Sequence, residues 1–127
     1  RGYMVTGWAS ENGHWFYYGV SGAQASGWVS VGGTWYYLDP ATGAMVTGWL
    51  ELDGVWFRLD GSGAMVTGWL KEGSSWYYLQ LSGAMATGWV RDASSWYYLD
   101  ETGVMVTGER TIDGVVYFFD PSGRLRS

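Results

Sequence analysis

The sequence contains no cysteine, only two prolines and few charged residues among its 127 positions. Without cysteine, the chain has neither a disulfide framework nor a thiolate zinc site. Charged residues make up 15% of the chain and the net charge is −5, so a basic footprint for nucleic acid or for an anionic membrane surface is missing. No run of about 18 apolar residues is present either, and membrane insertion is therefore not expected.

Aromatic residues and glycine are abundant instead, with ten Trp, ten Tyr and 21 Gly, and they recur with a fixed period. A Gly-Trp pair opens five repeats of 20 or 21 residues, and a second Trp follows the first by seven positions. A sixth copy has Glu109 and Val116 at the two Trp positions. A period of about 20 residues indicates units that stack and share a core with their neighbours.

Each repeat has the pattern of a β-hairpin. Dipeptides such as Asn12-Gly13, Gly32-Gly33 and Asp53-Gly54 lie between the two Trp residues and suit two-residue type I′ turns. Gly73-Ser74 and Ala93-Ser94 are weaker turn signals at the same place. The flanking segments are rich in Trp, Tyr, Val and Leu, which favour strands.

The turn position predicts which side chains share a face of each hairpin, because opposed residues point to the same side and neighbours alternate. In the second repeat, one face carries Val29, Val31, Tyr36 and Leu38, and the other carries Trp28, Ser30, Trp35 and Tyr37. The first face stays apolar at its centre in the first five repeats and is the predicted core. The second face places a polar residue between its two Trp residues, namely Ser10, Ser30, Glu51, Lys71 or Arg91. We therefore expect the Trp pairs to be only partly buried rather than core.

We predict an all-β chain with one repeat-built domain over residues 1–127. Its units run approximately over 7–26, 27–47, 48–67, 68–87, 88–107 and 108–127. Gly2 to Thr6 match the end of a preceding repeat, and no signal peptide is found, so we expect an excerpt of a longer array.

The motif of Gly-Trp, then Trp-Tyr-Tyr-Leu seven residues later, then Asp, Gly, Met and Thr-Gly-Trp resembles the choline-binding repeats of bacterial surface proteins, autolysins and phage lysins. The resemblance covers residues 2–123. It implies a left-handed β-solenoid of about six stacked β-hairpins, with choline held between consecutive hairpins by two aromatics from one hairpin, a third from the next and often a Met. It also implies choline or phosphocholine on teichoic acid as the partner, and an extracellular location, secreted or on the bacterial cell surface.

Physical chemistry agrees with that implication. A quaternary ammonium cannot donate hydrogen bonds, whereas aromatic π faces attract it by about 0.5–2 kcal/mol per contact and pack against its methyl groups. After the costs of association, we expect micromolar to millimolar affinity per site. Several sites on one array would then gain by avidity on a polymer that carries many cholines.

Carried onto this sequence, the family pattern predicts five cages between consecutive hairpins. They are Trp8, Trp15 and Tyr37; Trp28 and Trp35 with Arg58; Trp49, Trp56 and Tyr78; Trp69, Trp76 and Tyr98; and Trp89, Trp96 and Phe118. The third member is taken as the second aromatic after each second Trp, because it shares a face with a Trp pair; the first aromatic is the alternative. Cage walls are also expected from Met45, Met65, Met85 and Met105, which could instead be gap fillers.

Arg58 distinguishes the predicted second cage, because a guanidinium repels a cationic ligand or stacks on Trp in its place. We expect that cage to be weak or empty, which leaves about four working sites.

No catalytic constellation, metal site or cofactor motif is found. His14 is a lone histidine beside a turn, and the recurrent Asp39, Asp60, Asp100 and Asp120 are expected to bond to the backbone of nearby turns. We therefore predict a binding module and not an enzyme. A glucan-binding repeat module and a structural spacer or self-assembly module of an adhesin are the alternatives, and exposed aromatics at the ends leave a homodimer through the terminal hairpins open.

Overall fold

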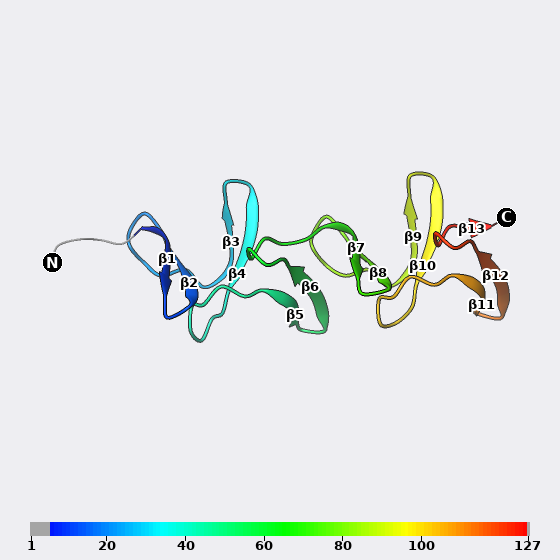
Figure 1. The fold of residues 1–127 in the computed structure, drawn as a ribbon, viewed down its shortest axis with the longest axis horizontal. Helices are drawn as coiled ribbons and strands as arrows, with labels where there is room; N and C mark the ends of the chain where they lie inside the picture. Colours follow the sequence, from blue (N-terminus) through cyan, green and yellow to red (C-terminus); the bar gives the residue numbers. More distant parts are fainter. Residues whose placement is uncertain (1–5, 127) are drawn as a thin grey trace. The chain divides into compact units, whose positions relative to one another are not determined.

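The computed structural model describes residues 6–126, and all regular structure in that range is β (Figure 1). Each repeat forms one antiparallel hairpin of two five-residue strands. The strands are β1 (Gly7–Glu11), β2 (His14–Tyr18), β3 (Gly27–Val31), β4 (Thr34–Leu38), β5 (Gly48–Leu52), β6 (Val55–Leu59), β7 (Gly68–Glu72), β8 (Ser75–Leu79), β9 (Gly88–Asp92), β10 (Ser95–Leu99), β11 (Gly108–Ile112), β12 (Val115–Phe119) and β13 (Leu125–Arg126). Strand β13 adds a third strand to the last hairpin. The predicted all-β class of repeated hairpins is confirmed.

The predicted turns and registers are confirmed as well. In the second hairpin, Val31 pairs with Thr34 and Trp28 pairs with Tyr37. Both residues of the Gly32-Gly33 turn have positive φ, at 61° and 87°. Even Ala93-Ser94, which has no glycine, adopts φ of 50° and 71°, so the surrounding strands impose the turn on a sequence that disfavours it. The residues Gly2 to Thr6, expected to end a preceding repeat, lie almost entirely outside the described residues. No helix in the described range is long and apolar enough to cross a membrane.

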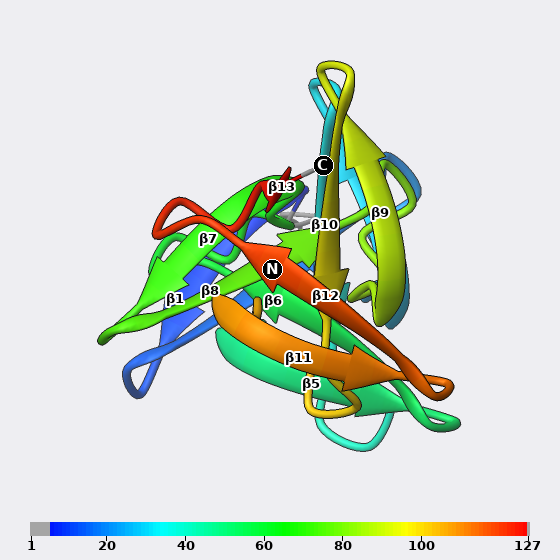
Figure 2. The same ribbon diagram turned by 90° about the vertical axis from the view of Figure 1, so that its right-hand side faces the viewer.

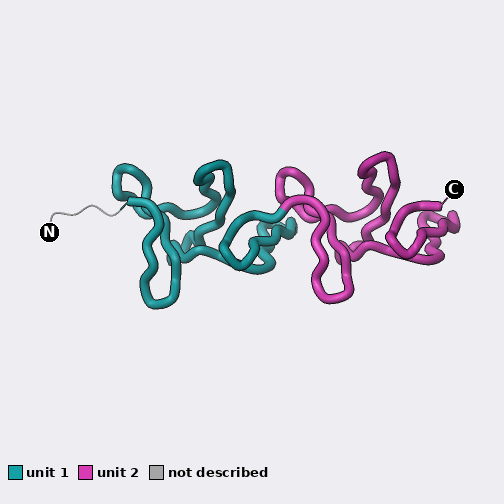
Figure 3. The backbone as a smooth tube through the Cα atoms, turned by 45° about the horizontal axis from the view of Figure 1, so that its top comes forward, with its two compact units in different colours: residues 1–66 teal, residues 67–127 magenta. Residues whose placement is uncertain are grey.

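The hairpins group into two compact units, which meet between Val66 and Thr67 (Figure 3). Unit 1 contains the hairpins β1–β2, β3–β4 and β5–β6, and unit 2 contains β7–β8, β9–β10 and β11–β12. Seen end-on, the three hairpins of unit 2 point in three different directions while their bases converge (Figure 2). The hand expected for the solenoid stays a prediction.

The fully buried core is one end of the predicted core face, not the whole of it. The only side chains that are completely enclosed among residues 6–126 stand at the end of a second strand, and they are Leu38, Leu59, Leu79 and Leu99. Phe119 takes this place in the last hairpin and packs with Val106 and Ile112. Val29 and Tyr36, predicted as core, are only half-buried. Because the hairpins diverge from their bases, only the strand ends at the base are surrounded on every side.

Backbone hydrogen bonds of the linkers tie successive hairpins together. The amide of Met45 donates to the carbonyl of Trp15 in the preceding hairpin at 2.7 Å. The next residue, Val46, donates to the carbonyl of Tyr37 in its own hairpin at 2.9 Å. Met65 and Met105 donate in the same way to Trp35 and Trp76, both at 2.8 Å. Each such linker is thus bonded to two hairpins at once.

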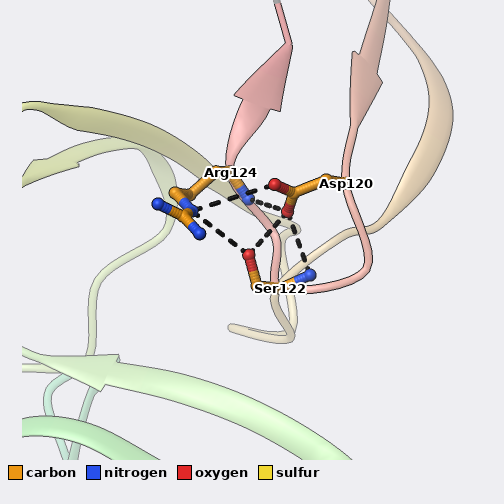
Figure 4. A network of polar contacts seen from close by, with 3 residues as sticks. All are labelled: Asp120, Ser122 and Arg124. Carbon is orange, nitrogen blue, oxygen red and sulfur yellow. Dashed lines mark hydrogen bonds and ion pairs between the residues drawn. The ribbon is translucent and has the colours of Figure 1, made fainter.

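Aspartate organises the turn that leads out of most hairpins, as predicted. Oδ1 of Asp120 accepts hydrogen bonds from the amide and the hydroxyl of Ser122, at 2.9 and 2.6 Å, and from the amide of Arg124 at 2.9 Å (Figure 4). The Arg124 Nε lies 3.8 Å from Asp120 Oδ2. Asp60 and Asp100 make the same three hydrogen bonds in their own turns.

These hydrogen bonds favour the ionised carboxylate and lower its pKa below the ordinary 3.8. The hydroxyl of Ser62 is the largest cause of the lowered pKa of Asp60, and that of Ser122 is the largest for Asp120. Burial opposes the shift most strongly at Asp100, where it would raise the pKa, but the bonds from Thr102 and Val104 outweigh it.

A carboxyl whose pKa is lower in the folded than in the unfolded protein stabilises the fold above the unfolded value. That stability is lost as the pH falls through the folded pKa. We expect the urea midpoint to be constant above about pH 5 and to fall once the pH drops below 3.8. Asp100→Asn should lower the midpoint at neutral pH and shrink the acid-induced drop. The exposed neighbour Glu101 supplies the control, Glu101→Gln. If the urea midpoint falls by the same amount at acid pH in the wild type and in Asp100→Asn, this account is contradicted.

Candidate functional site

The first Trp of a hairpin contacts aromatic rings from two hairpins. The Trp8 ring centroid lies 5.0 Å from that of Tyr17, which is its cross-strand partner, and 4.9 Å from that of Tyr36 in the next hairpin. The same edge-to-face contacts with the next hairpin are made by Trp28 to Phe57 at 5.2 Å, Trp69 to Tyr97 at 4.8 Å and Trp89 to Tyr117 at 5.0 Å. Successive hairpins are therefore packed face to back, with the Trp face of one against the opposite face of the next.

An open pocket of about 370 Å³ lies in the first of these gaps. It is lined by Trp8 and Trp15 from the first hairpin, Tyr36 from the second, Met45 from the following linker, and the backbone turn at Gly61-Ser62. Four separate parts of the chain thus build one site. The structure brings together Trp8 and Trp15, which we predicted in one cage, with Met45, one of the predicted cage walls.

A similar pocket of about 330 Å³ lies in the last gap. Its walls are Trp89, Trp96, Tyr117 and Leu125. Leu125 of β13 is the counterpart of Met45, and it supplies an apolar wall where the repeat has lost its methionine.

The third aromatic wall differs from the residue we expected. It is Tyr36 in the first pocket and Tyr117 in the last, whereas the sequence pattern predicts Tyr37 and Phe118. Tyr37 is buried against Trp28 of its own hairpin instead. The physical reason is the face-to-back packing. In each hairpin the second aromatic after the second Trp lies on the same face as that hairpin's own Trp pair. The first aromatic lies on the opposite face, which is the face that contacts the Trp pair of the preceding hairpin.

Phe118 and Tyr98 follow the same rule. Tyr98 packs on Trp89 of its own hairpin, with centroids 5.1 Å apart, and does not face Trp69. Phe118 is 53% exposed and lines a separate pocket with Val116 and Arg126. It has no Trp to pack on in its own hairpin, because the residue opposite it is Glu109.

The second and fourth gaps repeat the aromatic arrangement. Trp28 meets Phe57 and Trp69 meets Tyr97, while the linkers of Met65 and Met105 bond to the carbonyls of Trp35 and Trp76. The third predicted cage joins Trp49 and Trp56 of unit 1 to Tyr78 of unit 2, and its assembly stays a prediction. Within unit 2, Tyr78 packs on Trp69 at 4.8 Å.

Arg58 lies elsewhere than expected. Its guanidinium carbon lies 5.8 Å from the ring centroid of Trp49, its cross-strand partner, and its Nη1 donates to the carbonyl of Leu59 at 2.6 Å. It therefore takes the place that Tyr17 and Tyr37 take in the first two hairpins. The aromatic that meets Trp28 is Phe57, so the reason for expecting a weak second cage does not hold.

The second Trp of each pair keeps an accessible surface. Trp15, Trp35, Trp56, Trp76 and Trp96 are 46%, 44%, 39%, 38% and 42% exposed. Where the two rings of a pair are in contact, they are nearly perpendicular, at 81° for Trp49 and Trp56 and 87° for Trp89 and Trp96. Each such pair forms a corner of two π faces. Among residues 6–126 no three His, Cys, Asp or Glu side chains are grouped so that they could hold a metal ion.

Known proteins share this repeat pattern and this fold. A family model described as a choline-binding repeat matches residues 5–48, 46–87 and 86–126. No curated protein sequence matches the chain.

Several solved structures are similar. Choline binding protein F from Streptococcus pneumoniae, crystallised in the presence of a tetrasaccharide-pentapeptide peptidoglycan analogue, has a TM-score of 0.91 and 42% identity, covering 96% of this chain and 41% of that one. A complex of CbpF with ipratropium has a TM-score of 0.91 and 44% identity, covering 99% and 40%. The multimodular pneumococcal cell-wall endolysin from phage Cp-1, complexed with choline, has a TM-score of 0.65 and 34% identity, covering 100% and 39%. The chain spans about two fifths of the length of these proteins.

Gly63 lies directly against Met45, the methionine that lines the first pocket. Its φ is +89°, and a Cβ there would overlap the Sδ of Met45. We expect Gly63→Ala to lower the free energy of unfolding by about 2–4 kcal/mol, because it combines backbone strain with displacement of Met45. Urea titration measures this loss.

Gly61 offers a matched control in the same turn, because its backbone lies outside the left-handed region and open space surrounds its Cβ. Gly61→Ala should change stability by less than about 0.5 kcal/mol. In a double-mutant cycle, Met45→Ala should relieve part of the Gly63→Ala loss. Additive losses would show that Met45 and Gly63 are not coupled.

Proposed function

Because the chain belongs to the choline-binding repeat family, we propose that it is a non-catalytic module that binds choline or phosphocholine of bacterial cell-wall teichoic acid. The observation that carries the proposal is the pocket of Trp8, Trp15, Tyr36 and Met45. Its walls are π faces and a thioether, which suit a methylated cation that cannot donate a hydrogen bond.

The corner geometry favours a compact cation over a sugar. The nearly perpendicular rings of Trp89 and Trp96 form a corner that one trimethylammonium group fits, and Tyr117 closes the third side. A sugar ring is broader and stacks the C–H bonds of one of its faces on one open aromatic face. This supports choline over the glucan alternative as the ligand of these pockets.

The arrangement supports several weak sites on one chain. The first and second gaps lie within unit 1, the fourth and fifth lie within unit 2, and we propose a pocket for one cation in each. Each combines a Trp pair with the first aromatic of the next hairpin. A polymer that carries many cholines could occupy several of them, and binding would then gain from avidity beyond the micromolar to millimolar range of one site.

The similar proteins suggest where such a module acts. One is described as a cell-wall endolysin complexed with choline, and another was crystallised with a peptidoglycan analogue. We infer that this chain works outside the cell, on the surface of a bacterium or as a secreted protein, and attaches its parent protein to the wall.

Choline should stabilise the protein, because a ligand that binds only the folded state raises its stability. We expect the melting temperature to rise by several degrees with choline at tens of millimolar, and calorimetry to report about four sites. Glucan oligosaccharide at the same concentration should leave both readouts unchanged. If choline produces neither heat nor stabilisation, the proposal is wrong; a response to glucan alone would point to the carbohydrate-binding function.

The geometry also predicts which aromatic matters. Tyr36→Leu removes the π face from the first pocket but keeps an apolar side chain, and it should reduce the calorimetric number of bound cholines by about one. Phe16 occupies the same position in the first hairpin, and residues 1–6, which precede that hairpin in this chain, contain no Trp that could contact it. Phe16→Leu should therefore leave the number of sites unchanged. Equal losses in the two variants would refute the assignment of Tyr36.

A further inference from the structure

One cage tryptophan is hydrogen-bonded to a carboxylate. The indole Nε1 of Trp69 donates to Oδ2 of Asp92 at 3.0 Å, and the bond is partly buried. Trp69 lies on β7 and Asp92 ends β9, so the bond joins two successive hairpins of unit 2. A hydrogen bond to an ionised acceptor is shorter and stronger than one between neutral groups.

This bond is specific to the fourth gap among the four that lie within the units. Asp92 is the last residue of the first strand in its hairpin. The residues at that position opposite Trp8, Trp28 and Trp89 are Val31, Leu52 and Ile112. A hydrocarbon side chain cannot accept a hydrogen bond, so these three Trp residues have no acceptor from this position.

We propose that Asp92 is a positioning residue that makes the fourth pocket, formed by Trp69, Trp76 and Tyr97, the tightest cation site of the four. The proposal rests on the proposed function. Asp92 acts through Trp69 in two ways: it fixes the orientation of the indole, and its negative charge increases the electron density that the indole ring offers to a cation.

The other charges near the gap support this ranking. Lys71 stands between Trp69 and Trp76 on the same face, but it is exposed and its charge is screened by water. At the fifth pocket the charge beside the tryptophan is positive instead of negative, because the Arg91 guanidinium carbon lies 5.9 Å from the Trp96 ring centroid. A resident cation on that ring weakens its attraction for a second one. The fourth and fifth pockets thus differ in electrostatics although their aromatic contacts are alike.

The test follows individual indole N–H signals by NMR in the whole chain labelled with ¹⁵N-tryptophan. Choline is titrated into the wild type and into Asp92→Asn, which keeps an oxygen that can accept the bond but removes the charge. Asp113→Asn is the matched control, because it removes one carboxylate from a turn of the last hairpin at a residue with φ of 50°, which asparagine tolerates. A second titration uses 3,3-dimethylbutan-1-ol, the uncharged isostere of choline.

We expect the Trp69 signal of the wild type to reach its midpoint at a lower choline concentration than the Trp8 and Trp89 signals. Asp92→Asn should raise the Trp69 midpoint for choline by about three- to tenfold and leave the other midpoints unchanged. The midpoint for the uncharged isostere should stay the same, which a merely structural role of Asp92 would not allow. Asp113→Asn should behave as the wild type does.

Two results would overturn the inference in different ways. If no indole signal of the wild type moves with choline, the proposed function fails and the inference fails with it. If the signals move but Asp92→Asn leaves the Trp69 midpoint for choline unchanged, or shifts the choline and isostere midpoints equally, only the role of Asp92 is refuted.

Discussion

A hairpin of two five-residue strands cannot enclose a core by itself, so this fold depends on packing between successive hairpins. Two contacts provide it within each unit. Leucines such as Leu38 and Leu59 are fully enclosed where the hairpin bases converge, and linker amides such as that of Met45 donate to the carbonyl of the preceding hairpin. In addition, the rings of Trp8 and Tyr36 contact each other across the gap between their two hairpins. The same gaps that hold the chain together are therefore the places where a ligand can be held.

This dependence links stability to binding. The first pocket takes walls from two hairpins, a linker and a later turn, so its shape exists only when several repeats are stacked. Gly63 illustrates the link, because the absence of its side chain lets Met45 lie where it lines the pocket. A ligand in such a gap contacts residues that are distant in sequence, and it would strengthen the junctions that the fold needs.

The repeats share a scaffold but not an electrostatic environment. Asp92 bonds to Trp69, Arg91 lies over Trp96 and Arg58 lies over Trp49. In the first two hairpins, an uncharged serine, Ser10 or Ser30, stands between the two Trp residues. An array with unequal sites responds to ligand over a wider range of concentration than an array of identical ones. Substitutions at the positions around the Trp pairs change the sites without disturbing the hairpins, because those side chains do not form the buried core.

The sequence by itself determined the hairpins, their registers and which side chains share a face. Turn dipeptides set the register, and the alternation of side chains along a strand then assigns Trp28 and Tyr37 to one face and Tyr36 to the other. It did not determine which face of one hairpin meets which face of the next, since that depends on the route of the linker. Only the tertiary structure decided that the hairpins pack face to back. For that reason Tyr36 rather than Tyr37 lines the first pocket, and Arg58 lies on Trp49 instead of blocking the gap at Trp28. The alternation of side chains along a strand fixes the two sides of a hairpin. Contacts between residues of different repeats, such as Trp8 and Tyr36, decide which hairpin face lies against which.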